Sequence, residues 1–284
     1  MEKLIDMHMH TTYSDGELSP DELINLAIEK NIQTMAITDH DTIEGIKRVD
    51  KSKYPDIEII NGIELSAKFD IGQMHILGYD IDLESEILNN KMTELKNNSI
   101  DSLLSTMEQI KRDYGIRFSY EDIKKMINSS HNLNRVDLAK LCVKYGYADN
   151  VQDAFDKYLR RARKEVKKYI KGLEYQDCIE LILNSGGIPV LAHPKSLKLN
   201  KEDFLILLED MINCGLQGIE VYHSSHSKEE MDLYLKIAEE YNLLISGGSD
   251  YHGPIAKPDI EIGTGENNNL KIKKLSLLDK IHQI

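Results

Sequence analysis

Short strand-like runs alternate with amphipathic helical patterns through most of this chain, and this alternation limits the folds open to it. Strands are predicted at residues 3–7, 34–38, 57–67 and 73–81. A helix is predicted from Pro20 to about Asn31, because Ser19 can cap its first turn and Glu22 can close a capping box. Alternating strands and helices favour a parallel sheet or barrel.

The pattern changes between residues 85 and 172, where stretches rich in Lys, Asn, Glu and Leu predict consecutive helices. The alternation then resumes, with predicted strands within residues 186–193, 215–223 and 242–253, helices at 201–214 and 228–241, and a last helix after residue 269. We therefore expect an α/β fold in which residues 1–84 and 173–284 form one barrel, and residues 85–172 form an inserted helical subdomain.

Composition excludes several classes of function. Against 48 acidic residues the chain has 35 lysines and arginines, a formal charge of −13, so its overall field repels duplex nucleic acid and anionic lipid. An anionic substrate must then be captured locally. The three cysteines, Cys142, Cys178 and Cys214, are far apart, which argues against disulfides or a thiolate metal site. With no long apolar run and no leader-like N-terminus, we expect a cytoplasmic protein without membrane contact.

Histidines gather at predicted strand ends. Six of the ten lie at or just beyond such ends: His8, His10, His40, His75, His193 and His252. Carboxylates accompany them, namely Asp15, Asp39, Asp41, Glu64 and Asp250. In a parallel barrel the loops after the strands converge on one face, where active sites lie. Imidazole and carboxylate donors without thiolate suit Zn²⁺, Mn²⁺ or Fe²⁺.

The spacing of His8 and His10 also fits a metal site. Side chains two apart in an extended segment point to the same face, so both imidazoles can reach one ion. A lone H-x-H is more often a pair of surface histidines. The recurrence of such residues at successive strand ends favours the metal interpretation.

The ordered motifs DMHMHTTYSDG, AITDHDTIEG, GIELSA, QMHILGY, VLAHP and GGSDYHG resemble those of the polymerase-and-histidinol-phosphatase (PHP) superfamily of metal-dependent phosphoesterases. The resemblance covers nearly the whole chain. It is strongest to the stand-alone branch that contains nucleoside 3′,5′-bisphosphate phosphatases and a 5′-to-3′ exoribonuclease. It implies a distorted (β/α)7 TIM-like barrel, with the helical insertion capping the active-site face.

The resemblance also implies three divalent ions per chain. The first would be held by His8, His10, Glu64 and Asp250; Glu64 would bridge to a second ion bound by His75 and His193; the third would bind Asp15, His40 and His252. Histidinol-phosphate phosphatases tend to carry histidine at the position of Asp15. Aspartate here therefore favours a nucleotide substrate over histidinol phosphate.

Such a centre implies hydrolysis of a phosphate monoester by attack of metal-bound hydroxide. Catalytic roles are assigned to Asp15, His40, Glu64, Asp250 and His223. Arg135 and His223 are the candidate contacts to substrate phosphate, although Arg135 is followed by Val136 and Asp137 where the family pattern has proline and histidine. The sequence does not distinguish these roles from an exposed side chain at Arg135 and a histidine at position 223 that only orients a neighbouring ligand.

Further residues have two interpretations. Asp6, Asp39 and Asp41 could orient liganding imidazoles or belong to turns. The basic run at residues 158–171 is either a solvated helix face or a contact for an oligonucleotide tail. His131, His226 and His282 receive no functional role.

The alternatives to a nucleotide phosphatase are a 5′-3′ exonuclease on short RNA and a non-catalytic metal-binding PHP module. The oligomeric state is not predicted.

Overall fold

The computed structural model describes residues 3–128, 133, 135–162 and 172–283. The chain divides into two compact units, which are Met1–Asn90 with Gly172–Ile284, and Lys91–Lys171. Their arrangement relative to each other is not described, so the role of the helical segment as a cap over the barrel stays a prediction.

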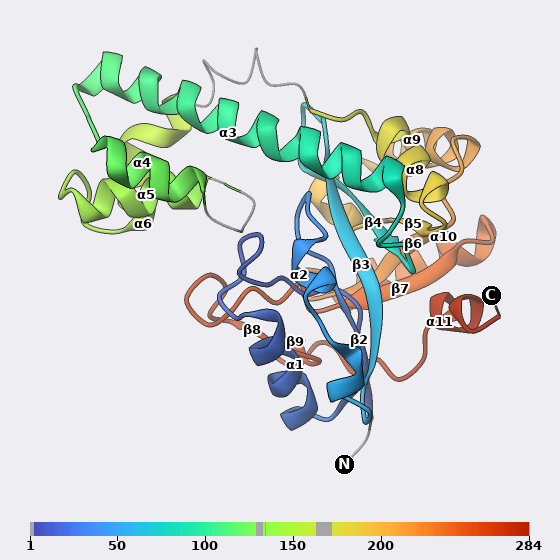
Figure 1. Cartoon of the computed structure of the whole chain (residues 1–284). Coiled ribbons are helices and arrows are strands. Elements are labelled where there is room, and N and C mark those ends of the chain that lie inside the picture. The colour runs from blue at the N-terminus through green and yellow to red at the C-terminus, as the bar shows by residue number, and fades with distance from the viewer. Residues whose placement is uncertain (1–2, 129–132, 134, 163–171, 284) are drawn as a thin grey trace. The chain divides into compact units, whose positions relative to one another are not determined.

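The first unit is built on a sheet of seven strands in chain order (Figure 1). These are β1 (Leu4–Asp6), β2 (Ile32–Ile37), β3 (Glu58–Ala67), β4 (Met74–Tyr79), β5 (Ile188–Leu191), β6 (Gly218–His223) and β7 (Leu244–Gly248). Hydrogen bonds from Met7 N to Gly247 O (3.2 Å) and from His10 N to Tyr251 O (3.0 Å) join the chain after β1 to the end of β7. The sheet therefore closes on itself, which confirms the distorted TIM-like barrel.

Strand β4 runs antiparallel to both β3 and β5, while the other pairs are parallel. The expectation of an entirely parallel sheet was wrong at this strand. The physical reason is the short connection at residues 68–73, which contains no helix and can only return the chain beside β3. The reversal places the amino end of β4, with His75, beside the carboxyl end of β3, where Ser66 pairs with His75.

Helices cover the outside of the barrel. The first-unit helices are α1 (Pro20–Glu29), α2 (Glu44–Lys47), α8 (Tyr175–Asn184), α9 (Lys201–Asn213), α10 (Lys228–Glu240) and α11 (Ser276–Ile281), with 3-10 turns at Lys51–Lys53 and Pro194–Leu197 and a small hairpin of β8 (Ile260–Glu261) and β9 (Gly265–Glu266). Helix α1 packs on β2, α8 on β3 to β5, and α10 on β6 and β7. The predicted capping box between Ser19 and Glu22 is confirmed.

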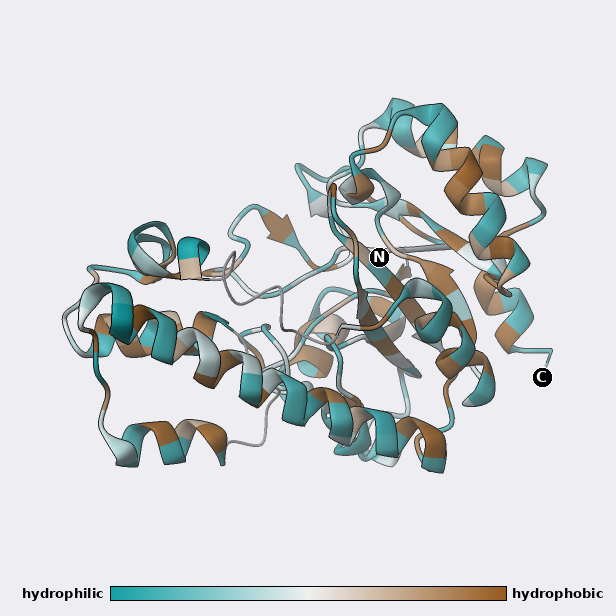
Figure 2. Cartoon of the chain, turned by 90° about the horizontal axis from the view of Figure 1, so that it is seen from above, coloured by the Kyte–Doolittle hydropathy of each residue, from teal (hydrophilic) through white to brown (hydrophobic). Residues whose placement is uncertain are grey.

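The barrel interior is apolar away from its carboxyl-end face. Figure 2 shows hydrophobic residues concentrated on the strands, whereas the helices alternate hydrophobic and hydrophilic stretches. The main cluster joins β1, β4 and β5 to the C-terminal segment that ends in α11. Inside it, the fully buried Tyr79 donates its hydroxyl hydrogen to Met7 O (3.0 Å) and accepts one from Ser246 Oγ (3.0 Å). The polar tip of this side chain is therefore satisfied within the core.

The second unit is helical. It holds most of α3 (Glu86–Tyr114), with α4 (Tyr120–Ile127), α5 (Arg135–Lys144), α6 (Val151–Ala154) and a π-helical turn at Phe155–Leu159. Its own cluster of buried residues runs from Leu103 through Cys142 to Ala162. All three cysteines are free. Within the described part of the chain, no helix combines the length and the apolar character needed to cross a membrane.

Candidate metal centre

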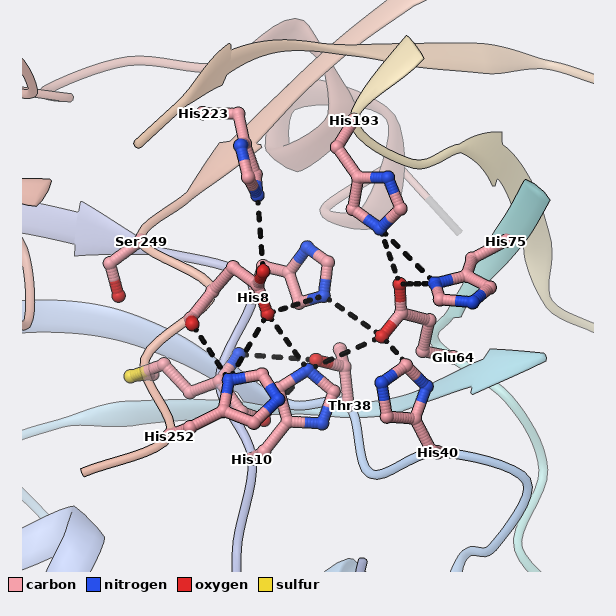
Figure 3. Close-up of polar contacts among 12 residues, drawn as sticks. His8, His10, Thr38, His40, Glu64, His75, His193, His223, Ser249 and His252 are labelled. Carbon is pink, nitrogen blue, oxygen red and sulfur yellow. Dashed lines mark hydrogen bonds and ion pairs between the residues drawn. The ribbon is translucent and has the colours of Figure 1, made fainter. Parts of the chain in front are cut away.

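One carboxylate lies at the middle of the histidines, as Figure 3 shows. Glu64, at 1% exposure, directs Oε1 toward His75 Nδ1 and His193 Nε2, each at 2.9 Å. Its other oxygen, Oε2, lies 3.2 Å from His8 Nε2, 3.3 Å from His10 Nε2 and 3.1 Å from His40 Nδ1. The two oxygens thus face two different sets of imidazoles, which is the arrangement of a bridging ligand.

Two further carboxylates complete the group. Asp250 Oδ1 lies 3.2 Å from His10 Nε2 and 3.3 Å from His252 Nδ1. Asp15 Oδ1 lies 3.2 Å from His252 Nε2, and Asp15 Oδ2 lies 3.9 Å from His40 Nε2. All nine ligands predicted from the sequence therefore lie together. We call this set the Glu64 cluster: His8, His10, Asp15, His40, Glu64, His75, His193, Asp250 and His252.

The Glu64 cluster draws on almost every strand end of the barrel. His8, His10 and Asp15 follow β1, His40 follows β2, His193 follows β5, and Asp250 with His252 follows β7. Glu64 lies in the last part of β3, and His75 reaches the same face only because β4 is reversed.

Two members of the cluster have backbone conformations that are rare for residues other than glycine. The φ angle is +22° at His193 and +56° at Asp250. Such conformations cost about 1–3 kcal/mol each and persist only where the surroundings impose them. Here the closing hydrogen bond from Asp250 N to His8 O (2.8 Å) and the bond from His193 N to Glu220 Oε2 (2.7 Å) hold both residues toward the cluster.

Sequence reasoning missed Glu220. This fully buried residue accepts a hydrogen bond from His193 N and lies with Oε1 3.0 Å from His8 Nδ1, leaving His8 Nε2 to face Glu64. A carboxylate that binds the outer nitrogen of an imidazole fixes its tautomer and ring orientation. The available signal was a glutamate inside the apolar strand run GIEVYH, three residues before His223.

The aspartates proposed to orient imidazoles act differently. Asp39 accepts hydrogen bonds from Thr11 N and Ser14 Oγ, each 2.7 Å long. Asp6 accepts from Ser249 N (2.8 Å) and Gly263 N (2.7 Å). Within the described residues, neither carboxylate forms an ion pair with an imidazole, so both fix the backbone of the loops that carry the ligands. Asp41 accepts from Ser66 N at 2.8 Å.

The donor atoms fit metal ions. Among the described residues, the buried atoms His8 Nε2, His10 Nε2 and Glu64 Oε2 form no hydrogen bond of good geometry. In the part of the chain that the structure describes, four sets of donors have their ligand atoms within 4.8 Å of one another: His8, His10 and Glu64; His40, Glu64 and His75; His10, Asp15, His40 and His252; and His8, Glu220 and His223. Buried polar atoms that converge without hydrogen bonds suit a site whose charge is balanced by cations.

Comparison with known families agrees with this geometry, because the model of the PHP domain matches residues 6–245. The chain belongs to the PHP domain family. A 5′-3′ exoribonuclease of Haemophilus influenzae is 28% identical over 99% of this chain and 97% of its own. A 3′,5′-nucleoside bisphosphate phosphatase of Chromobacterium violaceum is 27% identical over 88% of this chain and 87% of its own.

Solved structures give the same result for the fold. An amidohydrolase from Chromobacterium violaceum, solved with bound sulfate and no metal, matches with a TM-score of 0.79 and 25% identity. The match covers 98% of this chain and 96% of the other. The similarity thus includes the helical segment as well as the barrel of the PHP domain.

In this PHP domain, burial and neighbouring charges shift the pKa of several members of the Glu64 cluster. Burial opposes protonation of His10, but contacts with Asp250 and Glu64 outweigh it and raise the pKa of the imidazole to about 9. Burial also disfavours the ionised form of Glu64, yet His40 and His8 hold the pKa of its carboxyl well below the usual range. By contrast, burial lowers the pKa of His40 to about 3.

The substrate contacts predicted from sequence are only partly placed. His223 Nε2 is buried at the edge of the cluster, 3.4 Å from Asp250 Oδ2. Arg135 lies in the helical unit, where its guanidinium is 5.4 Å from the centre of the Phe155 ring, so its predicted role stays a prediction. His226 is buried and its Nδ1 donates to Val221 O (2.9 Å), and His282 pairs with Glu58 (2.7 Å). His131 lies outside the described residues.

The contact between Glu220 and His8 gives a testable prediction. Glu220→Gln removes the charge that orients His8, and we expect the affinity for Mn²⁺ to fall by about 10–100-fold. The measurement is a competition titration with a chelating dye on metal-stripped protein. Glu261→Gln, at an exposed carboxylate paired with Lys30, is the matched control. Equal affinities of the Glu220→Gln and Glu261→Gln variants would contradict the assignment.

The raised pKa of His10 gives a second prediction. At about pH 8 this imidazole holds a proton, whereas a metal-binding imidazole must be neutral, so Mn²⁺ binding releases protons. Since fewer protons compete at higher pH, the affinity for metal rises with pH until the pH passes the pKa of about 9. Calorimetric titration in buffers of different ionisation enthalpy measures this release. Binding without net proton release at about pH 8 would refute the raised pKa of His10.

Proposed function

We propose that this chain is a metal-dependent phosphoesterase that hydrolyses a phosphate monoester of a small nucleotide, such as a nucleoside 3′,5′-bisphosphate. The observation that carries the proposal is the bridging position of Glu64 between two sets of imidazoles, with Asp15 and Asp250 beside them. Membership of the PHP domain family supports it. So does the similarity over most of the chain to a nucleoside bisphosphate phosphatase.

Three divalent ions, of manganese, zinc or iron, are the proposed cofactors. Glu64 Oε2 with His8, His10 and Asp250 would hold one, and Glu64 Oε1 with His75 and His193 a second. Asp15, His40 and His252 would hold the third, and these three lie in one of the convergent donor sets. The donors are nitrogen and oxygen atoms only, which suits borderline divalent metals.

The bound ions would supply an activated water and neutralise charge on the ester phosphate. The chain itself holds the side chains that would bind the ions and fixes the orientation of their rings. Glu220 fixes His8, and Ser196 Oγ lies 2.7 Å from His193 Nδ1, so the Nε2 atoms of both rings point inward. His223 Nε2, 3.4 Å from Asp250 Oδ2, would contact the phosphate or give a proton to the leaving oxygen.

The proposed substrate is small and phosphorylated. Asp15 is present where histidinol-phosphate phosphatases tend to have histidine, which supports a nucleotide. Arg135 is the proposed second contact to phosphate. Of the basic run at residues 158–171, only residues 158–162 are described, and there Arg160 pairs with Asp156 at 3.1 Å on the same helix. A solvated helix face explains this part of the run.

The test of the proposed function is phosphate release by Mn²⁺-loaded protein from a panel of nucleotides and sugar phosphates. We expect the highest rate with nucleoside 3′,5′-bisphosphates. His193→Ala removes a ligand that faces Glu64 Oε1 and should abolish phosphate release and lower the bound metal, with the circular dichroism spectrum unchanged. No release from any ester by the unaltered protein would refute the proposal. Full activity of His193→Ala would show that this imidazole is not needed for hydrolysis and would contradict its role as a ligand.

A second candidate is 5′-3′ exonuclease action on short RNA, which the similarity to the Haemophilus influenzae exoribonuclease over 99% of this chain favours. The two candidates separate on a gel of short 5′-phosphorylated RNA. Stepwise shortening would establish the nuclease. An unchanged ladder together with rapid hydrolysis of a nucleoside bisphosphate would exclude it.

A further inference from the structure

A single lysine reaches the Glu64 cluster. Lys257 Nζ lies 2.5 Å from Asp250 Oδ2 and 3.4 Å from Asp250 O. Among the residues that the structure describes, it is the only lysine or arginine whose charged nitrogen forms an ion pair with a carboxylate of the cluster. Every other cationic partner of these carboxylates is an imidazole, which a metal can use as a ligand. An ammonium group cannot serve in that way.

Lys257 also differs from the cluster in exposure. Its side chain is 37% exposed, whereas that of Asp250 is 13% exposed and that of His8 is completely buried. The partly exposed Lys257 side chain therefore extends to the mostly buried Asp250 carboxylate.

The turn that carries Lys257 is held in place by Glu17. The Glu17 carboxylate accepts hydrogen bonds from Ile255 N (3.2 Å) and from Ala256 N, and Glu17 N donates to His252 O (2.8 Å). Lys257 N in turn donates to Gly253 O (3.0 Å).

The start of the same turn requires glycine. Gly253 has φ +112°, and a Cβ there would lie 2.6 Å from Glu17 Cβ. The position of the lysine is thus fixed by contacts within the same unit and does not depend on the helical segment.

Charge balance indicates what this lysine binds. Lys257 and the imidazoles offset the charge of Asp250. When divalent cations share that carboxylate, its attraction for the ammonium is reduced and Lys257 can bind another anion. The chain carries a formal charge of −13, so a phosphate dianion needs such a local cation. An ammonium offers three donors and a full positive charge to phosphate oxygens.

We propose that the Lys257 ammonium contacts the phosphate group that is hydrolysed, and that it holds this phosphate beside Asp250. The inference rests on the proposed phosphoesterase function and adds a substrate-binding residue to it. It also gives the GPIAKPD turn a role in substrate binding, with Glu17 as the residue that positions the turn.

The experiment compares Lys257→Met and Lys257→Arg with the unaltered protein, all loaded with Mn²⁺. Calorimetry gives the dissociation constant for inorganic phosphate, and steady-state kinetics gives KM and kcat. Since a hydrogen bond to a charged group is worth about 1.5–3 kcal/mol, Lys257→Met should weaken phosphate binding by about 10–100-fold. Lys257→Arg keeps the charge and should recover much of this loss. Lys30→Met, which breaks the exposed pair with Glu261, is the control for the loss of one positive charge.

The Mn²⁺ affinity of each variant, measured on metal-stripped protein, separates the two possible roles of the lysine. Weaker phosphate binding with Mn²⁺ affinity kept supports the inference. Unchanged phosphate binding with altered Mn²⁺ affinity would show that Lys257 only balances Asp250 and would overturn it. If the unaltered protein hydrolyses no ester, and the Lys257→Met variant binds phosphate more weakly than the unaltered protein, Lys257 still binds phosphate but the proposed function fails. If the unaltered protein hydrolyses esters, and Lys257→Met binds phosphate as Lys30→Met does, the proposed function stands and the inference about Lys257 fails.

Discussion

The structure depends on one buried carboxylate. Glu64 is 1% exposed and has five imidazole nitrogens within 3.3 Å, from histidines on four different segments of the barrel. An unpaired carboxylate at this depth would cost several kcal/mol, so the charge is tolerable only if the histidines converge on it. That convergence requires correct strand order, closure of the barrel and the reversal of β4. The arrangement of the strands and the geometry of the site therefore depend on each other.

The same requirement explains where the chain accepts strain. His193 and Asp250 adopt positive φ angles at the ends of β5 and β7. In each case a buried hydrogen bond holds the backbone so that the side chain points into the cluster. Glu220 connects these effects, because one of its oxygens binds His193 N while the other fixes the ring of His8. A single strand residue thus orients two proposed ligands from different strand ends.

Much of this could be predicted from the sequence. The strand and helix alternation, the capping box at Ser19 and the nine residues of the Glu64 cluster were all identified from local patterns and motif order. Each of these features is a pattern among a few neighbouring residues. Glu220 was missed because its function depends on His8, 212 positions away, and a lone glutamate in a strand has no local signature. The reversal of β4 was missed because the short connection after β3 was not weighed against the parallel pattern. For Asp6 and Asp39 the sequence left open whether they orient imidazoles or belong to turns, and the structure shows them bound to backbone and hydroxyl groups.

The most direct test of this account is anomalous diffraction from crystals of the Mn²⁺-loaded protein. The account predicts separate manganese peaks on the two sides of Glu64, one bound through Oε1 with His75 and His193, and one bound through Oε2 with His8 and His10. A third peak is predicted between Asp15, His40 and His252. Peaks that leave Glu64 without a metal, or a single ion bound through only one of its oxygens, would contradict the bridging role from which the proposed function is derived.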